Sequence, residues 1–231
     1  MKNENYRETL NKALSEGRNT LSEYESKIIL ASYQIPVTRE IPVETGDDVI
    51  PAAHEIGYPV VMKACSPDIS HKTERGLIRT DVRDDKEASD AFNDLMAGMN
   101  GGTGTVLIQE MIKGKRELVI GLIRDPQFGP CVMFGLGGIF TEILKDVSFR
   151  LAPLEKRDAF DMMDEIKAHK ILDAVRGMPP VDRELVSEML INVGKIGLTH
   201  DTIKEIDINP VIISGNRPIA ADALIVLQST A

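Results

Sequence analysis

Apolar positions in the first half of the chain alternate between two spacings, one typical of helices and one typical of strands. Residues 20–36 repeat apolar side chains along one helical face, at Leu21, Tyr24, Ile28, Ala31 and Ile35. Ser22 and Glu25 match a capping box at the start of this helix, and Pro36 is expected to end it. Further helices are expected over 47–57 and 84–100, and strands over 37–43, 58–64, 76–82 and 105–112. This alternation predicts a small α/β unit.

The second half has a different order of elements. Residues 116–125 and 130–138 are apolar runs joined by a Pro/Gly turn, which predicts a hairpin. Helical spacing follows over 155–175 and 182–198, and residues 203–227 predict a closing hairpin with a Gly-Asn turn. We therefore expect a helical arm over 1–19, one subdomain over 20–110 and a second over 111–231, with the two subdomains facing each other across a cleft.

Composition narrows the class of protein. Of the 231 residues, 42% are hydrophobic and 27% are charged, as in ordinary globular proteins. The net charge of −9 disfavours binding to nucleic acid or to anionic lipid, and no apolar run is long enough to suggest a membrane span. The polar N-terminus does not resemble a signal peptide, and Cys65 and Cys131 stand alone in apolar runs. A cytoplasmic protein with reduced thiols is expected.

Oxygen-bearing side chains interrupt the apolar pattern of the closing hairpin. Asp207 and Asn209 are two residues apart and therefore share one face of a strand. The Gly-Asn turn is expected to bring Asp222 back alongside them. Mg²⁺ takes a few such oxygens and fills its shell with water and phosphate. Polar residues on the solvent face of a hairpin are the alternative interpretation.

Three glycines lie at the end of the apolar run of residues 130–138. Gly135, Gly137 and Gly138 are spaced so that their backbone amides could form a cradle for phosphate oxygens. The spacing fits neither a dinucleotide-binding fingerprint nor a phosphate-binding loop that ends in Lys-Ser. A strand turn that binds nothing is the alternative.

Charged residues inside apolar runs need a reason for their position. Lys63 ends the buried run "PVVMK", where a phosphate would compensate its charge. A lysine whose ammonium reaches solvent is the alternative. Glu110 and Glu117 interrupt two further strands, and each is a candidate for contacting a nucleotide ribose or a metal-bound water. Each is equally compatible with the exposed position of an alternating strand.

One histidine stands in the loop "SPDISHKTERG", between two predicted strands. His71 is preceded by Asp68 and followed by Lys72 and Glu74. A neutral imidazole is a nucleophile near pH 7, and either carboxylate would fix its tautomer. The other histidines, at positions 54, 169 and 200, lie within or at the end of predicted helices and are expected to be structural.

Taken in order along the chain, these motifs resemble the ATP-grasp fold, an α/β fold with two subdomains. The stretches "VMKACSPDISHKTERGLI", "RDPQFGPCVMFGLGGIFTEILKDVSFRLAPL" and "EIDINPVII" resemble the β subunit of the ADP-forming acyl-CoA synthetases of the acetate–CoA ligase type, which are relatives of succinyl-CoA synthetase. The resemblance runs from about residue 20 to the C-terminus. After the His-Lys pair the family often has Ser-Asp-Val-Gly-Gly, whereas this chain has Thr73, Glu74, Arg75 and Gly76.

The resemblance implies a mechanism that the residues alone do not show. An α subunit binds CoA and forms the first phosphohistidine, and the phosphoryl group then passes to His71 and on to ADP. The resemblance further implies that Lys63 holds nucleotide phosphates near Gly137 and Gly138, that Asn209 and Asp222 bind Mg²⁺, and that Asp207 faces the transferring phosphate. It implies an α2β2 assembly.

Two other functions remain open on the sequence. A stand-alone ATP-grasp ligase that joins a carboxylate to an amine would not need His71, because its acyl phosphate forms directly. A nucleotide-sensing subunit without catalytic activity would bind ADP and never become phosphorylated.

Overall fold

The computed structural model describes residues 6–67, 76–99, 104–138 and 146–228. The chain separates into two compact units. Among the described residues, unit 1 contains Ser22–Glu25 and Thr38–Met111, and unit 2 contains residues 6–21, Ser26–Val37 and the residues from Ile112 to 228. Unit 1 extends to Met111, one residue beyond the end expected for the first subdomain. The segment 26–37, expected in the first subdomain, packs instead in unit 2, because Ile29, Leu30 and Ile35 are buried in the core of that unit.

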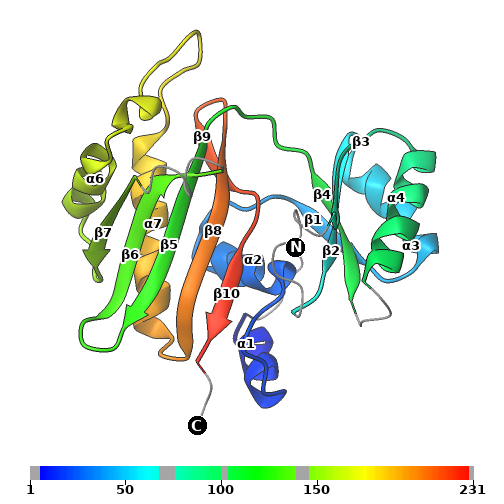
Figure 1. Ribbon diagram of the computed structural model, residues 1–231, viewed down its shortest axis with the longest axis horizontal. Helices are drawn as coiled ribbons and strands as arrows, with labels where there is room; N and C mark the ends of the chain where they lie inside the picture. Colours follow the sequence, from blue (N-terminus) through cyan, green and yellow to red (C-terminus); the bar gives the residue numbers. More distant parts are fainter. Residues whose placement is uncertain (1–5, 68–75, 100–103, 139–145, 229–231) are drawn as a thin grey trace. The chain divides into compact units, whose positions relative to one another are not determined.

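Unit 1 is a four-stranded antiparallel sheet with two helices. Its strands are β1 (Glu40–Val43), β2 (Val60–Cys65), β3 (Ile78–Val82) and β4 (Thr105–Glu110), in the order β1-β4-β2-β3. Helices α3 (Gly46–Ile56) and α4 (Asp85–Gly98) pack on each other and on the sheet (Figure 1). Asp84 caps α4 by accepting a hydrogen bond from Glu87 N, and Gly57 ends α3 with a φ of 93°.

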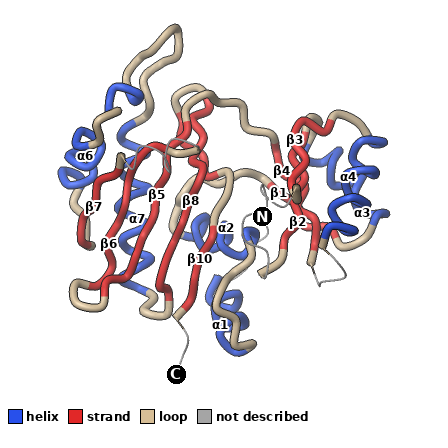
Figure 2. The backbone as a smooth tube through the Cα atoms, in the orientation of Figure 1, coloured by secondary structure: helices blue, strands red, loops and turns tan. Residues whose placement is uncertain are grey.

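Unit 2 holds a larger sheet, with β7 at one edge. Its strands are β5 (Glu117–Asp125), β6 (Gly129–Leu136), β7 (Val147–Leu151), β8 (Ile203–Ser214), β9 (Arg217–Ala220) and β10 (Leu224–Leu227). The order is β10-β8-β5-β6-β7 (Figure 2), and β9 pairs with the far end of β8. All the pairs are antiparallel. The closing hairpin predicted over 203–227 is confirmed.

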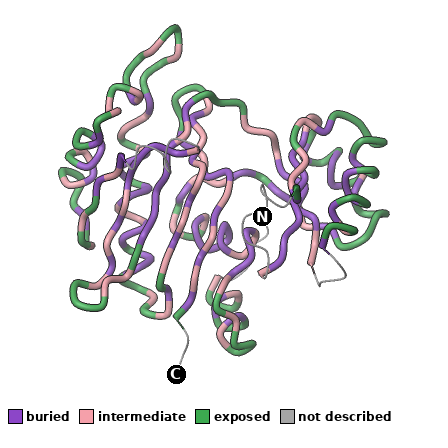
Figure 3. Tube along the Cα trace, in the orientation of Figure 1, coloured by how far each residue is buried: buried purple, intermediate pink, exposed green. Residues whose placement is uncertain are grey.

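Helices bury one face of the larger sheet. These are α6 (Lys156–Glu165), α7 (Arg183–Thr199), the short 3-10 helix η1 (His169–Leu172), α1 (Tyr6–Ser15) and α2 (Glu23–Ser32). Helix α7 packs on β5, β6 and β8. Figure 3 shows buried residues running along the first part of β5, whereas β6 and β8 alternate between buried and half-buried positions over most of their length. The half-buried positions of β8 therefore face away from this core, and they carry the polar residues.

The capping box expected at Ser22 is present: Ser22 N–H donates to Glu25 Oε2 at 2.8 Å, and Glu25 N–H donates to Ser22 Oγ at 3.3 Å. The helix ends at Ser32, four residues before Pro36, because Gln34 adopts a left-handed φ of 63°.

One helix was expected over 155–175, and this prediction was wrong. Helix α6 ends at Glu165, and Ile166 is extended with a ψ of 139°. The reason is a distant carboxylate: Asp146 accepts hydrogen bonds from Lys167 N at 2.7 Å and Ala168 N at 2.8 Å. These bonds satisfy the backbone amides of Lys167 and Ala168 in a turn between α6 and η1, so the helix does not continue through this turn.

Strand β7 was not expected from the sequence. Its apolar residues Phe149 and Leu151 are 45% and 49% exposed, whereas Ser148 is buried and donates to Met162 O. The usual alternation of apolar side chains toward the core is thus reversed at this sheet edge, and the pattern gave no strand signal.

Cys65 is buried and Cys131 is half-buried, and neither is in a disulfide. Among the described residues, no helix has both the length and the apolarity that a membrane crossing requires.

Candidate nucleotide and metal site

The polar positions of β8 lie on one face of the strand, as predicted. Asp207 and Asn209 are half-buried, whereas Ile206 and Ile208 between and beside them are buried in the core of unit 2. Asp207 lies opposite Gly121 of β5 and opposite Leu224 of β10. A strand with period-two alternation therefore carries an acid and an amide away from the helices that cover the other face.

The structure also brings Asp222 alongside this pair. Ala220 pairs with Val211, and Leu224 pairs with Asp207, so the connector Ala221–Ala223 runs past Asn209. Ala221 N–H donates to Pro210 O at 3.0 Å, which ties the connector to β8. The Asp222 carboxylate accepts a hydrogen bond from Ala223 N at 2.8 Å.

The electrostatics of Asp207 reflect this crowding. Burial, with the negative charges of Glu205 and Asp222, raises the pKa of Asp207 to about 6. A carboxyl group whose surroundings raise its pKa is a common feature of functional sites. Its negative charge is compensated when a cation or a reacting group binds next to it.

Among the described residues, no group of three His, Cys, Asp or Glu side chains is gathered closely enough to hold an ion by itself. The predicted ligand set is different in kind: one carboxylate, from Asp222, and one amide oxygen, from Asn209. Such a sparse set of oxygens suits Mg²⁺, which keeps water and phosphate as its other ligands. The excess of negative charge around Asp207 also fits a cation.

The glycine turn after β6 meets the same face. Gly138 has a φ of 63°, and its N–H points to Asn209 Oδ1 at 3.4 Å. A Cβ on Gly138 would collide with the carboxylate of Glu117, and a Cβ on Gly137 would lie 2.6 Å from Leu118 O. Gly137 is therefore required by the close approach of backbone, whereas glycine at position 138 is favoured by its positive φ, because the end of the Glu117 side chain could move aside.

Gly137 forms a backbone hydrogen bond within the larger sheet. Its N–H donates to Glu117 O at 2.9 Å, so this amide is already hydrogen-bonded. The donation of amides from Gly137 and Gly138 to phosphate remains a prediction, as does the contact of Glu117 with a nucleotide. What the structure adds is that Glu117, Gly138 and Asn209 meet in space although they are far apart in sequence.

In unit 1, Lys63 is buried near the end of β2 and forms an ion pair. Its Nζ lies 2.7 Å from Glu23 Oε1, and the two side chains are 6% and 0% exposed. Lys63 thus does not reach into solvent, which removes the alternative considered from the sequence. Its contact with a phosphate remains a prediction.

Sequence reasoning missed Glu23. The residue lies in the first turn of α2, where an acid is common for helix-dipole reasons alone. Its complete burial was the informative property, and only the three-dimensional structure reveals it.

Glu110 lies at the end of β4 and pairs with Arg39. Arg39 N–H donates to Glu110 Oε1 at 2.7 Å, and Arg39 Nε lies 3.3 Å from Oε2. Both carboxylate oxygens therefore contact the strand neighbour, and the role of Glu110 toward a nucleotide stays a prediction. His71 and its neighbours Asp68, Lys72 and Glu74 lie outside the described residues.

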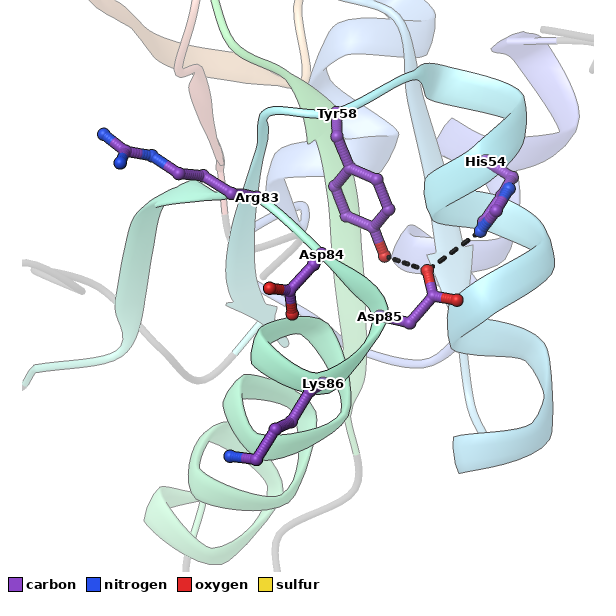
Figure 4. A pocket seen from close by; sticks show the side chains of 6 residues that line it. All are labelled: His54, Tyr58, Arg83, Asp84, Asp85 and Lys86. Carbon is purple, nitrogen blue, oxygen red and sulfur yellow. Dashed lines mark hydrogen bonds and ion pairs between the residues drawn. The ribbon is translucent and has the colours of Figure 1, made fainter.

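A surface hollow in unit 1 contains none of the predicted site residues. It is lined by His54, Tyr58, Arg83, Asp84, Asp85 and Lys86. Figure 4 shows His54 and Tyr58 converging on Asp85, whose Oδ1 lies 2.8 Å from His54 Nε2 and 3.1 Å from the Tyr58 hydroxyl. Burial and the bond to Asp85 raise the pKa of Tyr58 to about 12. These groups connect α3 to α4, which is a sufficient structural role.

Comparison with known protein families identifies the fold family of this chain. The family model described as an ATP-grasp domain matches residues 12–227, so the chain is an ATP-grasp protein. The expected fold class is thereby confirmed.

Individual relatives narrow this class. The I subunit beta of acetate–CoA ligase (ADP-forming) from Pyrococcus furiosus is 45% identical over 226 residues, which cover 96% of this chain and 97% of that protein. A solved structure of the Ca. Korarchaeum cryptofilum dinucleotide forming acetyl-coenzyme A synthetase 1, in complex with coenzyme A, Ca-AMPCP and HgCl+, matches with a TM-score of 0.92 and 42% identity, over 96% of this chain and 99% of that one.

A second structure of that archaeal enzyme, with coenzyme A and Mg-AMPPCP, has its phosphohistidine segment pointing towards the nucleotide binding site. It matches with a TM-score of 0.86 and 42% identity, over 96% of this chain and 100% of that one. The chain belongs to the family of ADP-forming acetate–CoA ligase β subunits, which are ligases with an ATP-grasp nucleotide-binding domain.

Proposed function

We propose that this chain is the nucleotide-binding subunit of an ADP-forming acyl-CoA synthetase that acts on acetyl-CoA, and that it passes a phosphoryl group from His71 to ADP. The observation that carries the proposal is the convergence of Glu117, Gly138, Asn209, Asp207 and Asp222 on one face of the larger sheet. Family membership over nearly the whole chain supports it.

The proposed step exchanges one bond for another. The bond between phosphorus and a ring nitrogen of His71 breaks, and a bond forms between phosphorus and a terminal oxygen of ADP, so that ATP leaves with the transferred group. The imidazole is released in its neutral form, because its other nitrogen keeps its proton throughout. Asp68 or Glu74 would accept a hydrogen bond from that nitrogen. Phosphoryl transfer of this kind depends mainly on positioning and on neutralisation of phosphate charge.

Each residue has a separate task in this step. Lys63 supplies a fixed positive charge for nucleotide phosphates, and the glycine turn lets backbone approach them closely. Asn209 and Asp222 would hold a Mg²⁺ ion, which supplies charge neutralisation when bound. Asp207, with its raised pKa, faces the transferring group, and Glu110 and Glu117 contact the nucleotide.

The full reaction requires a partner. An α subunit would bind CoA, convert acyl-CoA and phosphate to an acyl phosphate and free CoA, and form the first phosphohistidine with release of the acid. Together the two subunits would convert acyl-CoA, phosphate and ADP to acid, CoA and ATP. The name of the Pyrococcus relative, a β subunit, supports such a partner. We expect an α2β2 assembly. The cytoplasm suits it, since thiols such as Cys65 stay reduced there.

Family membership favours this function over the two rivals. A carboxylate–amine ligase and a nucleotide sensor would share the ATP-grasp fold, but the relatives found over the full length are acetate–CoA ligases.

The test is turnover with and without the partner. The chain mixed with its α subunit should make ATP from acetyl-CoA, ADP and phosphate, and His71→Asn should abolish this activity. His54→Asn is the matched control, since His54 lies on the surface of unit 1 and should leave turnover unchanged. Robust synthesis of acetyl-CoA by the isolated chain, or full turnover by the His71 variant, would overturn the proposal.

A further inference from the structure

A lysine is completely buried in unit 2 and is not used by the function proposed above. Lys27 lies in α2 and has a relative exposure of 0%. Its ammonium donates a hydrogen bond to Ala221 O at 3.0 Å, across 194 residues of sequence. A buried ammonium is costly, and an apolar side chain of similar size would fill the same core space without that cost. The position of Lys27 therefore calls for a specific role.

The carbonyl that Lys27 contacts belongs to the connector between β9 and β10. This connector, Ala221–Ala223, contains Asp222 at its centre. The peptide that joins Ala221 to Asp222 has its C=O bound by Lys27, while Ala221 N–H binds Pro210 O of β8. The backbone that leads into Asp222 is thus held from two directions.

The neighbouring residue of α2 holds the following strand. Ser26 Oγ accepts a hydrogen bond from Ile225 N at 3.1 Å, in β10. Helix α2 therefore contacts β10 through Ser26 and the connector between β9 and β10 through Lys27. The two contacts provide an internal comparison, because the Ser26 hydrogen bond is to β10 and the Lys27 hydrogen bond is to the peptide beside Asp222.

We infer that Lys27 is a positioning residue for the metal-binding carboxylate of Asp222. The inference rests on the proposed function, in which Asp222 is a Mg²⁺ ligand. The ammonium of Lys27 fixes the orientation of the peptide between Ala221 and Asp222. It thereby fixes the position of the Asp222 backbone from which the carboxylate side chain extends. Ligands must be held within about 0.5 Å of the productive position, and loss of an outer partner of a metal ligand typically costs 10–100-fold in metal affinity.

The test measures binding of Mn²⁺, a spectroscopic substitute for Mg²⁺, in the presence of ADP. Lys27→Met keeps the shape of the side chain and removes the donor. We expect it to weaken the Mn²⁺ affinity of the ADP-bound full chain by about tenfold or more, measured by electron paramagnetic resonance. Ser26→Ala is the control from the same helix, and it should change the Mn²⁺ affinity less than twofold although it lowers the melting temperature.

A double-variant cycle separates positioning from a general effect on the fold. If Lys27 acts through Asp222, then Lys27→Met should have no further effect on Mn²⁺ affinity in a chain that already carries Asp222→Ala. A lysine that only supports the core would instead weaken binding equally in both backgrounds. Unaltered Mn²⁺ affinity in Lys27→Met, or equal losses in both backgrounds, would overturn the inference.

A second variant covers the case in which Lys27→Met does not fold. Lys27→Gln keeps a polar end but is one atom too short to reach Ala221 O, so it should show the same loss of Mn²⁺ affinity. Parent-like affinity in Lys27→Gln would refute the positioning role. Failure of the proposed function looks different: in that case Asp222→Ala would not alter Mn²⁺ binding, whatever the Lys27 variants do.

Discussion

The buried ion pair between Glu23 and Lys63 gives a prediction for stability that does not depend on any ligand. The two charged atoms are 2.7 Å apart, and the side chains are 0% and 6% exposed. Glu23→Gln keeps the size of the side chain and removes its charge, so the ammonium of Lys63 loses a negative neighbour in a buried position. Removal of one partner from a buried pair typically costs about 3–5 kcal/mol.

Replacement of both partners should cost much less. In Glu23→Leu/Lys63→Met the two charges disappear together, and side chains of similar volume fill the space. Such exchanges are often neutral or stabilising, so we expect the double variant to lie within about 1–2 kcal/mol of the parent. The exposed pair Lys86–Asp90 is the control from the same unit, and Asp90→Asn should cost less than about 0.5 kcal/mol.

Urea unfolding followed by circular dichroism at pH 7.5 measures these free energies. The reasoning is refuted if Glu23→Gln costs no more than Asp90→Asn, or if the double variant loses the sum of the two single losses. The double variant also separates stability from function, because a folded chain without Lys63 should still bind ADP more weakly than the parent.

Three further predictions concern unit 2. Asp207→Asn should stabilise the metal-free chain by about 2–3 kcal/mol at pH 7.5, because folding raises the pKa of Asp207 from 3.8 to about 6. The parent chain has the full stability of the protonated carboxyl below about pH 4 and loses it as the pH rises through 6, whereas the amide of the variant does not ionise. Urea unfolding in EDTA at both pH values tests this, and an equal gain at pH 4 would contradict it. Burial and the charge of Asp125 raise the pKa of the Cys131 thiol, so in a Cys65→Ala background the pH midpoint of its alkylation should lie above that of free cysteine; a midpoint at or below that value would contradict the assignment. Gly137→Ala should cost more stability than Gly215→Ala, since a Cβ at position 137 would lie 2.6 Å from the backbone oxygen of Leu118, whereas a Cβ at position 215 meets nothing within 4 Å; equal costs in thermal unfolding would argue against that close approach.

The elements with regular patterning were predictable from the sequence. The hairpin predicted over 203–227 is present, because the alternation around Ile206 and Ile208 leaves one choice for the outward face of β8. The capping box at Ser22 is a local motif and needs no tertiary information. The side-by-side placement of Asp207, Asn209 and Asp222 followed from the turn between the strands.

Features that depend on distant residues were not predictable. The break after α6 is caused by Asp146, which is some 20 residues away in the chain. The pairing of Lys63 with Glu23 and the contact of Lys27 with Ala221 join segments that no periodicity connects. Glu23 and Lys27 also resemble ordinary surface residues of a helix in the sequence, and only their burial distinguishes them.

The most direct test of the relay is to load the isolated chain with phosphate from ATP labelled at the γ position, in the presence of Mg²⁺. We expect an acid-labile, base-stable label on a single peptide that contains His71, because the reverse transfer needs only the nucleotide site. The label should be absent from His71→Asn and normal in His54→Asn. An unlabelled parent chain, or a label that persists in the His71 variant, would contradict the relay.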